Sequence, residues 1–363
     1  MFAGGGTGGH LYPAIALADE VKKQRPEADV LFVGTKGRIE SRVVPDRGYP
    51  FASIRVTGLQ RRVSLRTLMF PLTLMIAMVQ SFVLIRKFRP DVVVGTGGYV
   101  CGPPVFVATL LGIPTLIQEQ NSYPGVTTRI LAKRVNEVHI TFEGSRRYFK
   151  RTDNVKLSGN PVRVAIGTIS REEGARFFGV SAGQRILLVA GGSLGAASIN
   201  RAVLTIVPDL ASAGVQILWA TGVQDHAAIE QAVGAFTAAV RGLVHLQPYI
   251  ENMEYALGAC DLAVCRSGAT TLAELMQAGV PSILVPYPHA AADHQTENAR
   301  AMVNQGAAVM CRDSDLKLAL LSTIKDLLGS PERLRAMSAH ARDMSKPHAA
   351  EALAGALLHL AKA

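Results

Sequence analysis

Short apolar runs that alternate with helical stretches limit what this 363-residue chain can fold into more than any other feature. The runs lie at residues 28–35, 90–98, 113–120, 185–193, 215–222, 260–268 and 280–288. Apolar runs of this length, separated by helices, are typical of parallel strands that are buried on both faces. The expected fold class is therefore α/β.

The two halves of the chain follow the same plan. Each opens with a strand that runs into a glycine turn and then a helix, AGGGTGGH in the first half and AGGSLGAAS in the second. A single hydrophobic core rarely serves a chain of this length, so we expect two domains. The prediction is a pair of doubly wound, Rossmann-like domains that face a cleft.

We place the domain boundary after the segment LSGNPVR, which divides the chain into residues 1–163 and residues 164–344. Residues 164–184 hold no apolar run, and Ser170 with Glu173 predicts the capping box of a short helix there. Apolar residues at helical spacing predict a last helix within residues 345–363. It can pack on either domain, including back on the N-terminal one.

The charge balance favours anionic partners, because 38 Lys and Arg residues against 28 Asp and Glu residues give a net charge of +10. Basic runs interleaved with aromatic residues are absent, so nucleic acid is not an expected partner. The four cysteines are scattered, without metal-ligand spacing, which argues against a disulfide framework and a zinc site. A reducing cytoplasm fits this cysteine usage.

A glycine-packed turn at residues 4–9 closes on His10 and leads into a helix that we expect to begin at Pro13. Glycines let a ligand approach the backbone, and the free N–H groups of a helix start favour negative charge. The turn therefore predicts a phosphate-binding site with a titratable side chain at its edge. Little chain precedes it, so we expect the natural protein to begin several residues upstream.

The same turn contains the spacing G-x-G-x-x-G at Gly4, Gly6 and Gly9, which is typical of nicotinamide-dinucleotide sites. In such folds the second strand ends in Asp or Glu, which binds the ribose. Here the run ADVLFVGT ends in Gly34 and Thr35, which argues against NAD. No cofactor is expected.

In the second half, the turn at Ser267 and Gly268 leads into a helix that contains Glu274. The free N–H groups at the start of this helix can hold a diphosphate. Spacing alone leaves two interpretations of Glu274. It is either the partner of Thr271 in a capping box or a carboxylate that accepts both hydroxyls of a ribose.

Polar side chains also gather where other runs end. These are Glu119 and Asn121 in the segment QEQN, the turn GTGGY at residues 95–99, and Asp293, His294, Gln295 and Asn298 after the run 280–288. The carboxyl ends of parallel strands share one edge, where open α/β sheets bind ligands, so these residues are candidates for binding.

The segment Asp313-Ser314-Asp315 matches the D-x-D pattern of metal–nucleotide sites. Ser and Asp favour helix caps, and no apolar run brings this segment to the edge of a sheet. We therefore expect it to cap the helix that follows, and we expect no metal.

Residues 67–85 contain no charge and are nearly long enough to cross a bilayer, which needs about 20 apolar residues. Basic residues flank them, at Arg61, Arg62 and Arg66 on one side and at Arg86, Lys87 and Arg89 on the other. A transmembrane helix, an interfacial helix and a buried crossover helix compete. The run 90–98 follows too soon for the chain to cross and return. We favour a crossover helix with an exposed apolar and basic end that docks on an anionic membrane surface, and a wholly buried helix stays open.

Several segments together resemble the MurG family: GGTGGH, PDVVVGTGGYVCGP, QEQN, GNPVR, GGSLGA, CRSGATTLAEL and DHQTENA. The resemblance spans nearly the whole chain and implies the GT-B type of glycosyltransferase fold. It implies an inverting transfer of N-acetylglucosamine from UDP-N-acetylglucosamine to undecaprenyl-pyrophosphoryl-N-acetylmuramoyl-pentapeptide, lipid I to lipid II, in peptidoglycan synthesis. A peripheral enzyme on the cytoplasmic face of the bacterial plasma membrane is implied as well.

The resemblance also implies roles for single residues, with the UDP-sugar bound mostly by the C-terminal domain and the acceptor and membrane on the N-terminal side. The implied donor contacts are Thr7, Gly8, Gly9, Asn121, Arg163, Ser193, Ile250, Ala269, Thr270, Thr271, Leu272, Ala273, Glu274 and Gln295. Gly97, Gly98 and Tyr99 would lie on the acceptor side, and His10 and Glu119 would be catalytic. Glu274 would hold the ribose and Gln295 the sugar hydroxyls.

His10 is our candidate general base, because a helix N-terminus disfavours the imidazolium and keeps the ring neutral. Glu119 is the rival base. Two other functions are open: a UDP-N-acetylglucosamine 2-epimerase with the same architecture, and a non-catalytic membrane-recruiting subunit. An epimerase needs further acid–base residues and no lipid-facing surface, and the presence of both halves in one chain argues against a recruiting subunit.

Overall fold

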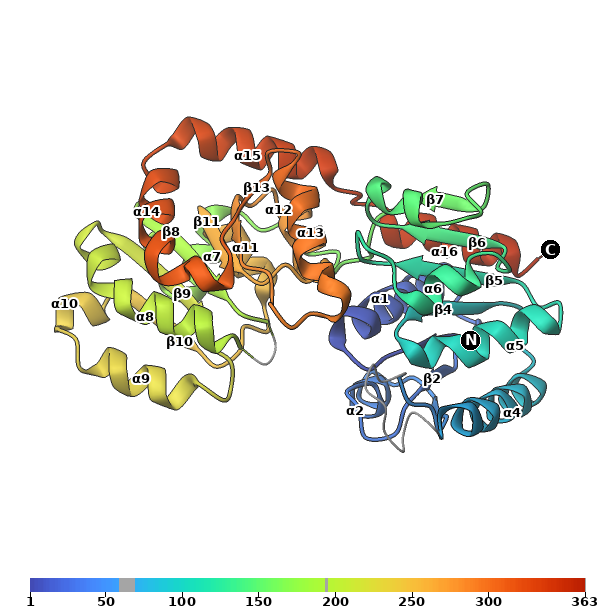
Figure 1. Cartoon of the computed structure of the whole chain (residues 1–363). Helices are drawn as coiled ribbons and strands as arrows, with labels where there is room; N and C mark the ends of the chain where they lie inside the picture. The colour runs from blue at the N-terminus through green and yellow to red at the C-terminus, as the bar shows by residue number, and fades with distance from the viewer. Residues whose placement is uncertain (59–68, 193–194, 363) are drawn as a thin grey trace. The chain divides into compact units, whose positions relative to one another are not determined.

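A computed structural model describes residues 1–58, 69–192 and 195–362 of the chain. The chain forms two compact units, Met1–Val162 with Lys346–Ala363, and Arg163–Ser345. In each unit, helices cover a sheet of parallel strands (Figure 1). The predicted α/β class with two doubly wound domains is confirmed.

The first unit contains the strands β1 (Phe2–Gly4), β2 (Phe32–Gly34), β3 (Phe51–Ser53), β4 (Val93–Gly97), β5 (Thr115–Glu119), β6 (Glu137–Ile140) and β7 (Val155–Leu157). Its helices include α1 (Gly8–Gln24), α2 (Glu40–Asp46), α4 (Phe70–Phe88), α5 (Gly102–Leu110), α6 (Val126–Leu131) and α16 (Ala349–Leu360), with 3-10 turns η1 (Tyr99–Cys101) and η2 (Glu143–Tyr148). The strand order is β3-β2-β1-β4-β5-β6-β7.

The second unit contains β8 (Arg185–Ala190), β9 (Val215–Ala220), β10 (Val244–Gln247), β11 (Leu262–Cys265), β12 (Ser282–Leu284) and β13 (Ala308–Met310), in the order β10-β9-β8-β11-β12-β13. Its helices are α7 (Arg171–Phe178), α8 (Ala197–Ser212), α9 (His226–Gly234), α10 (Ala238–Arg241), α11 (Met253–Ala259), α12 (Ala269–Ala278), α13 (His294–Val303), α14 (Leu316–Leu328) and α15 (Pro331–Met344), with 3-10 turns η3 (Ala291–Asp293) and η4 (Asp313–Asp315).

Both sheets reverse their winding direction beside the first strand, between β1 and β4 in one unit and between β8 and β11 in the other. Open α/β sheets bind ligands at the carboxyl ends of the strands at such a switch point. The candidate residues after these strands therefore occupy the expected ligand-binding edge of each sheet.

The apolar runs are continuous because neighbouring residues of a central strand face different cores. Val93 and Val94 of β4 are both fully buried, the first in the cluster with Val105 and the second in the cluster with Leu11. A central parallel strand has no solvent face, so polar alternation is lost. The strands that no apolar run predicted include the four edge strands β3, β7, β10 and β13, which have one neighbour each.

The last helix, α16, packs on α1 of the first unit, where Leu353 and Leu357 join Leu11 and Leu17 in one core (Figure 1). The short helix α7 begins as predicted, since the Ser170 hydroxyl accepts from the Glu173 N–H at 3.2 Å.

The first helix begins at Gly8 and not at Pro13, so that prediction was wrong. The carbonyl of Thr7 already accepts the N–H of Leu11 at 3.2 Å, and Pro13 lies inside α1. Because proline has no N–H, the carbonyl of Gly9, four residues earlier, lacks its usual intrahelical donor.

The predicted crossover helix is α4, which connects β3 to β4 and packs on α5. It is long and apolar enough to cross a membrane by length and composition alone. Only Ala77, Ser81 and Ile85 of α4 are buried, so the wholly buried alternative was wrong. Residues 67 and 68 and the basic residues Arg61, Arg62 and Arg66 lie outside the described residues.

Candidate active site

The glycine turn after β1 is held from behind by the carboxylate of Glu40, a fully buried side chain at the start of α2. Glu40 Oε2 accepts the N–H of Gly6 at 3.0 Å, and Oε1 accepts the N–H and hydroxyl of Thr35 at 3.0 and 2.6 Å. Gly5 has a φ of +153°, and a Cβ there would stand 2.5 Å from the Glu40 carboxyl carbon. Glycine is therefore required for the turn to close over this carboxylate.

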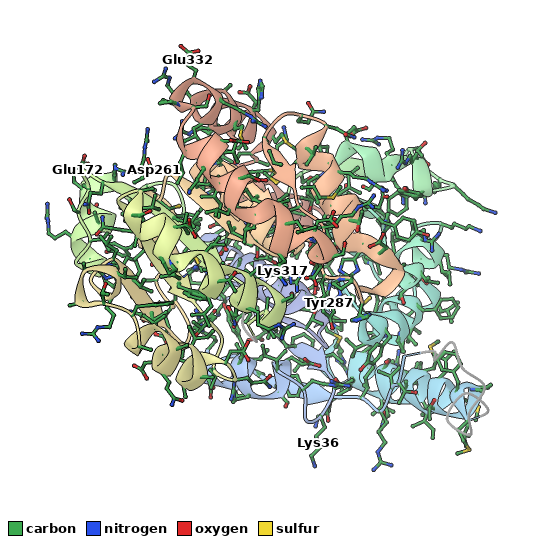
Figure 2. The ribbon with its side chains drawn as sticks, turned by 60° about the vertical axis from the view of Figure 1, so that its left-hand side comes forward. Lys36, Glu172, Asp261, Tyr287, Lys317 and Glu332 are labelled. Atoms are coloured by element: carbon green, nitrogen blue, oxygen red, sulfur yellow. The ribbon has the colours of Figure 1, made fainter. Side chains whose placement is uncertain are left out.

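Glu40 stays ionised although it is buried. Burial alone would raise its pKa, but the hydrogen bonds from Thr35 and Gly6 outweigh burial and lower the pKa below its ordinary 4.5. An acidic group therefore does lie next to the end of β2, because Glu40 bonds Thr35. Its carboxylate is hydrogen-bonded to the glycine turn and is not available to bind a ribose. Lys36, which follows Thr35, extends into solvent (Figure 2).

His10 lies in the first turn of α1 with its imidazole against the turn after β4. A Cβ on Gly97, whose φ is +106°, would stand 2.6 Å from His10 Nδ1. Gly97 thus leaves the space that the ring occupies, and Gly98 lies against the carbonyl of Gly5. The structure brings His10, Gly97 and Gly98 together, as neighbours across β1 and β4.

The N–H groups of Gly8 and Gly9, at the start of α1, have no acceptor within the described part of the protein. The Thr7 side chain makes no capping hydrogen bond. These groups are open to an anionic ligand in the way that helix starts favour. Tyr99, which the family resemblance placed on the acceptor side, lies in η1 and packs against the core of the first unit and against Gly58.

The loop after β5 is organised by Glu119, whose side chain is 3% exposed. Its Oε1 accepts the backbone and side-chain N–H groups of Asn121 at 3.1 and 3.2 Å, and its Oε2 accepts the N–H of Gly125 at 3.1 Å. Gln120, which lies between Glu119 and Asn121 in the sequence, contacts His10: Nδ1 of the ring lies 2.9 Å from Gln120 Oε1. The structure places Glu119 as the support of a loop that carries Asn121.

In the second unit, α12 begins at Ala269 with Gly268 as its N-cap residue. The capping-box interpretation of Thr271 and Glu274 is therefore wrong, because Thr271 lies inside the helix. The hydroxyl of Thr270 is buried without a hydrogen-bond partner among the described residues. An unpaired hydroxyl beside the open N–H groups of a helix start is suited to a phosphate oxygen.

Glu274 projects from α12 toward Arg163, whose Nη2 lies 3.5 Å from Glu274 Oε1. Arg163 Nη1 lies 3.0 Å from the carboxylate of Glu254 and donates to the carbonyl of Glu251 at 2.8 Å. Burial raises the pKa of Glu274 to about 7, against the opposing effect of the Arg163 guanidinium and with the help of the nearby Glu254. One arginine is thus shared by two carboxylates.

The turn after β11 is tied to the start of α13. The Ser267 hydroxyl donates to the Gln295 carbonyl at 2.8 Å, and Asn298 Nδ2 donates to the Ser267 carbonyl at 3.2 Å. Gln295 Oε1 accepts the N–H of Tyr287 at 2.9 Å. The structure therefore joins Gln295 to the α12 start, while fully buried Asn298 supports the turn from inside.

Four of the implied donor contacts are buried side chains: Ile250, which follows β10, and Ala269, Leu272 and Ala273 within α12. Leu272 is fully buried, so its backbone is the part of it that a ligand can reach. Ser193 lies outside the described residues. Asp293 precedes α13 in the left-handed region with φ +56°, and its carboxylate accepts the Thr296 hydroxyl at 2.6 Å.

Asp313 pairs with Arg266 at 2.5 Å and accepts from the Ser198 hydroxyl at 2.7 Å. The predicted side-chain cap is not formed, since Asp315 precedes α14 without a capping hydrogen bond. The strand β13 also delivers this segment to the sheet edge, contrary to our expectation. Within residues 1–58, 69–192 and 195–362, no cluster of His, Cys, Asp or Glu could hold a metal ion.

Sequence reasoning missed Glu40, Gln120 and Glu254. Glu40 lies in a segment without a strand or glycine signal, and its partners are 34 and 5 residues away. Gln120 was visible within QEQN, but its contact with His10 joins residues 110 apart. The signal that could have found it is its place at the end of β5, the strand beside β4.

Comparison with known proteins adds the family. The N-terminal domain of glycosyltransferase family 28 matches residues 1–140, and its C-terminal domain matches residues 186–353. The UDP-N-acetylglucosamine–N-acetylmuramyl-(pentapeptide) pyrophosphoryl-undecaprenol N-acetylglucosamine transferase of Chlorobaculum parvum is 46% identical over 100% of this chain and 99% of its own length. The chain belongs to the MurG family.

Solved structures agree with the family. The crystal structure of Acinetobacter baumannii MurG matches with a TM-score of 0.78 at 28% identity, over 99% of this chain and 98% of that one. A Listeria monocytogenes protein assigned as a UDP-N-acetylglucosamine 2-epimerase matches with a TM-score of 0.65 at 13% identity, over 94% of this chain and 91% of that one. This second likeness shows the fold alone.

Proposed function

We propose that this chain transfers N-acetylglucosamine from UDP-N-acetylglucosamine to undecaprenyl-pyrophosphoryl-N-acetylmuramoyl-pentapeptide in peptidoglycan synthesis. Its relatives carry the name of this reaction over the full length of the chain. The structural observation that best supports the proposal is the position of His10. Its half-buried ring lies at the switch point of the first sheet, and one ring nitrogen is hydrogen-bonded to Gln120.

The second unit binds the donor in this proposal. The start of α12 receives the diphosphate through the N–H groups of residues 269–271 and the Thr270 hydroxyl, which has no hydrogen-bond partner among the described residues. Glu274 accepts the ribose hydroxyls, and Gln295 contacts the sugar. The other donor contacts are Arg163, Ile250, the backbone of Leu272 and Ala273, Ser193, and from the first unit Thr7, Gly8, Gly9 and Asn121.

The reaction needs one base and one stabilised leaving group. The acceptor oxygen forms a bond to the anomeric carbon, its proton passes to His10, and UDP leaves with the electron pair of the broken carbon–oxygen bond. Helix N–H groups and the Arg163 guanidinium offset the charge that develops on the diphosphate. No metal and no covalent intermediate is needed for this balance.

The geometry supports His10 over Glu119 as the base. Both carboxylate oxygens of Glu119 already accept N–H groups from Asn121 and Gly125, so the carboxylate is engaged in holding the loop. The His10 ring makes one hydrogen bond among the described residues, through Nδ1, and its second nitrogen can take up a proton. Gly97, Gly98 and Tyr99 lie on the acceptor side in this proposal.

The membrane-docking surface is the exposed apolar face of α4, which we define as Leu72, Met75, Val79, Phe82 and Val83. These residues recur at helical spacing, and Arg86, Lys87 and Arg89 follow them as exposed cations. Leu110 and Leu111 are exposed at the end of α5, which packs on α4. An apolar stripe beside cations is suited to an anionic membrane surface, which in this proposal is the cytoplasmic face of the bacterial plasma membrane.

The activity is tested by following UDP release with and without a polyprenyl-pyrophosphoryl acceptor. Release that requires the acceptor supports the transferase, whereas conversion of UDP-N-acetylglucosamine alone would support the epimerase, and no turnover the recruiting subunit. The variant His10→Ala should lower kcat by about 10²-fold or more and leave UDP-sugar binding nearly intact. The control His348→Ala changes an exposed ring at the N-cap position of α16. Equal loss of binding and turnover would remove His10 from the base role.

Docking is tested by sedimentation with vesicles that contain anionic lipid. The double variant Met75→Asp, Val79→Asp should bind such vesicles at least about tenfold more weakly, because two carboxylates replace inserting side chains. Leu318→Asp is the matched control, since Leu318 is 87% exposed on α14 of the second unit. Unchanged binding of the double variant would reject α4 as the docking surface.

A further inference from the structure

The hydrogen bond between His10 and Gln120 can form with only one choice of donor and acceptor. Gln120 Nε2 lies 2.7 Å from the Thr96 carbonyl and 3.2 Å from the Gln118 carbonyl. Carbonyl oxygens only accept hydrogen bonds, so the amide nitrogen must face them. Gln120 Oε1 is then the atom at 2.9 Å from His10 Nδ1, and it can only accept.

A second buried amide locks this orientation. Gln118 Oε1 accepts from Gln120 Nε2, while Gln118 Nε2 donates to the Gly159 carbonyl at 3.4 Å and to Asn160 Oδ1 at 3.2 Å. Gln118 and Gln120 are each 1% exposed. Turning either amide would set oxygen against oxygen at buried positions, which is costly where water cannot compensate.

We propose that Gln120 is a positioning residue that holds neutral His10 in the tautomer with its proton on Nδ1 and a free lone pair on Nε2. Nδ1 must donate because Gln120 Oε1 has no proton to give. The hydrogen bonds of Gln118 and Gln120 thus leave Nε2 of His10 as the proton acceptor before any substrate binds. The inference rests on the proposed function, in which His10 is the base.

The proton balance of the reaction follows. The acceptor hydroxyl gives its proton to His10 Nε2 as its oxygen bonds to the anomeric carbon, and UDP departs with the electron pair. The resulting imidazolium keeps its Nδ1–H on Gln120. A neutral amide here takes the orienting part that a carboxylate has in a Ser-His-Asp triad. Unlike a carboxylate, it adds no net charge to stabilise the imidazolium.

The direct test is the 15N spectrum of the histidine side chains of the full chain, with His10 assigned by its absence from His10→Ala. At a pH where the ring is neutral, we expect a protonated Nδ1 and a pyridine-like Nε2. A protonated Nε2 in the wild-type protein would overturn the inference.

The functional test replaces the amide with an apolar side chain of similar length, Gln120→Met. A fixed wrong tautomer costs a serine protease about 10⁴-fold in kcat, and a ring free to sample both tautomers should lose less, about 10-fold to 10²-fold. The KM for UDP-N-acetylglucosamine should change less than threefold, or about 0.7 kcal/mol, and the 15N signals should show Nε2 protonation. The matched control is Gln216→Met, a buried amide of the second unit that bonds Ser181.

The two proposals fail separately. If Gln120→Met keeps wild-type kcat and the wild-type tautomer, Gln120 is structural and the inference is overturned. If the wild-type tautomer is as expected but His10→Ala retains full activity, the base assignment fails while the hydrogen bond stands. Loss of folding in Gln120→Met still leaves the wild-type spectrum to decide.

Discussion

Glu40 of α2 in the first unit is fully buried and Glu274 of α12 in the second is 16% exposed, and the surroundings of the two carboxylates are opposite. Glu40 accepts three hydrogen bonds from Gly6 and Thr35, which lower its pKa below the ordinary 4.5. Glu274 shares Arg163 with a second carboxylate, Glu254, and burial raises its pKa to about 7.

This difference distinguishes a carboxylate that stabilises the fold from one that binds a ligand. A carboxylate whose lone pairs are taken by backbone N–H groups stabilises the fold and has little left to offer a ligand. One that is buried with incomplete partners destabilises the fold unless a ligand completes them. By this comparison Glu40 shapes the turn, whereas Glu274 is kept for ribose hydroxyls, as proposed above.

Removing the charge of Glu40 should have the largest effect. Glu40→Gln places an amide –NH₂ against the N–H of Gly6 and should lower the free energy of unfolding at neutral pH by about 3 kcal/mol. The Glu40 pKa is lowered in the folded state, so its contribution is present above pH 4.5 and fades as pH falls through the folded value. Denaturant unfolding at several pH values measures both.

Glu332→Gln is the control for this prediction, because Glu332 is an exposed carboxylate at the start of α15 (Figure 2). It should change the free energy of unfolding by no more than about 0.5 kcal/mol. If Glu40→Gln behaves like Glu332→Gln, the turn does not depend on the buried carboxylate.

Glu274→Gln should have the opposite sign. The folded pKa of about 7 exceeds the ordinary 4.5, so the unfolded chain loses this proton first and the protein loses stability as pH rises between the two values. Removing the carboxyl should raise the free energy of unfolding at pH 8 by about 2 kcal/mol. UDP affinity should fall in the same variant. Destabilisation at pH 8 would show that Glu274 supports the fold as Glu40 does.

The affinity for UDP should rise with pH, because the ionised Glu274 is the better acceptor for ribose hydroxyls. With a pKa of about 7, the ionised fraction grows about tenfold from pH 6 to pH 8, and the association constant should follow it. Calorimetric titration of the wild-type protein and Glu274→Gln checks this. The same pH slope in both would assign the dependence to another group.

The smallest expected effect concerns Glu254. Glu254→Gln removes the second carboxylate and leaves Arg163 to Glu274, and both changes lower the Glu274 pKa. The midpoint of UDP affinity should move down by about half a pH unit. A midpoint that moves upward would mean that Glu254 supports Arg163 more than it competes for it.

The central strands were predictable and the edges were not, for one physical reason. β4 and β5 are buried on both faces and carry apolar residues at consecutive positions, as Val93 with Val94 and Leu116 with Ile117 illustrate, so the run stands out. An edge strand such as β10, with the sequence VHLQ, is partly exposed and carries no such run. Its pairing comes from the neighbouring strand.

The candidate site divides in a similar way. His10, Glu119 and the start of α12 follow from strand, turn and helix signals that are local in the chain. The partners of these groups are not local in the chain: Gln120 lies 110 residues from His10, and the strands β8 to β11 separate Arg163 from Glu274 in the sequence. The capping-box interpretation of Glu274 could be excluded only once the structure showed that Gly268 is the N-cap residue of α12.

By itself, the amino-acid sequence determined the α/β class, the duplicated strand–turn–helix plan and the strand ends where ligands bind, because burial pattern and turn chemistry act over a few residues. Tertiary structure alone decided that α16 packs on α1, that Glu40 closes the first turn, and that one arginine is shared by two carboxylates. Those contacts join distant segments, and the order of strands in each sheet sets which distant segments meet.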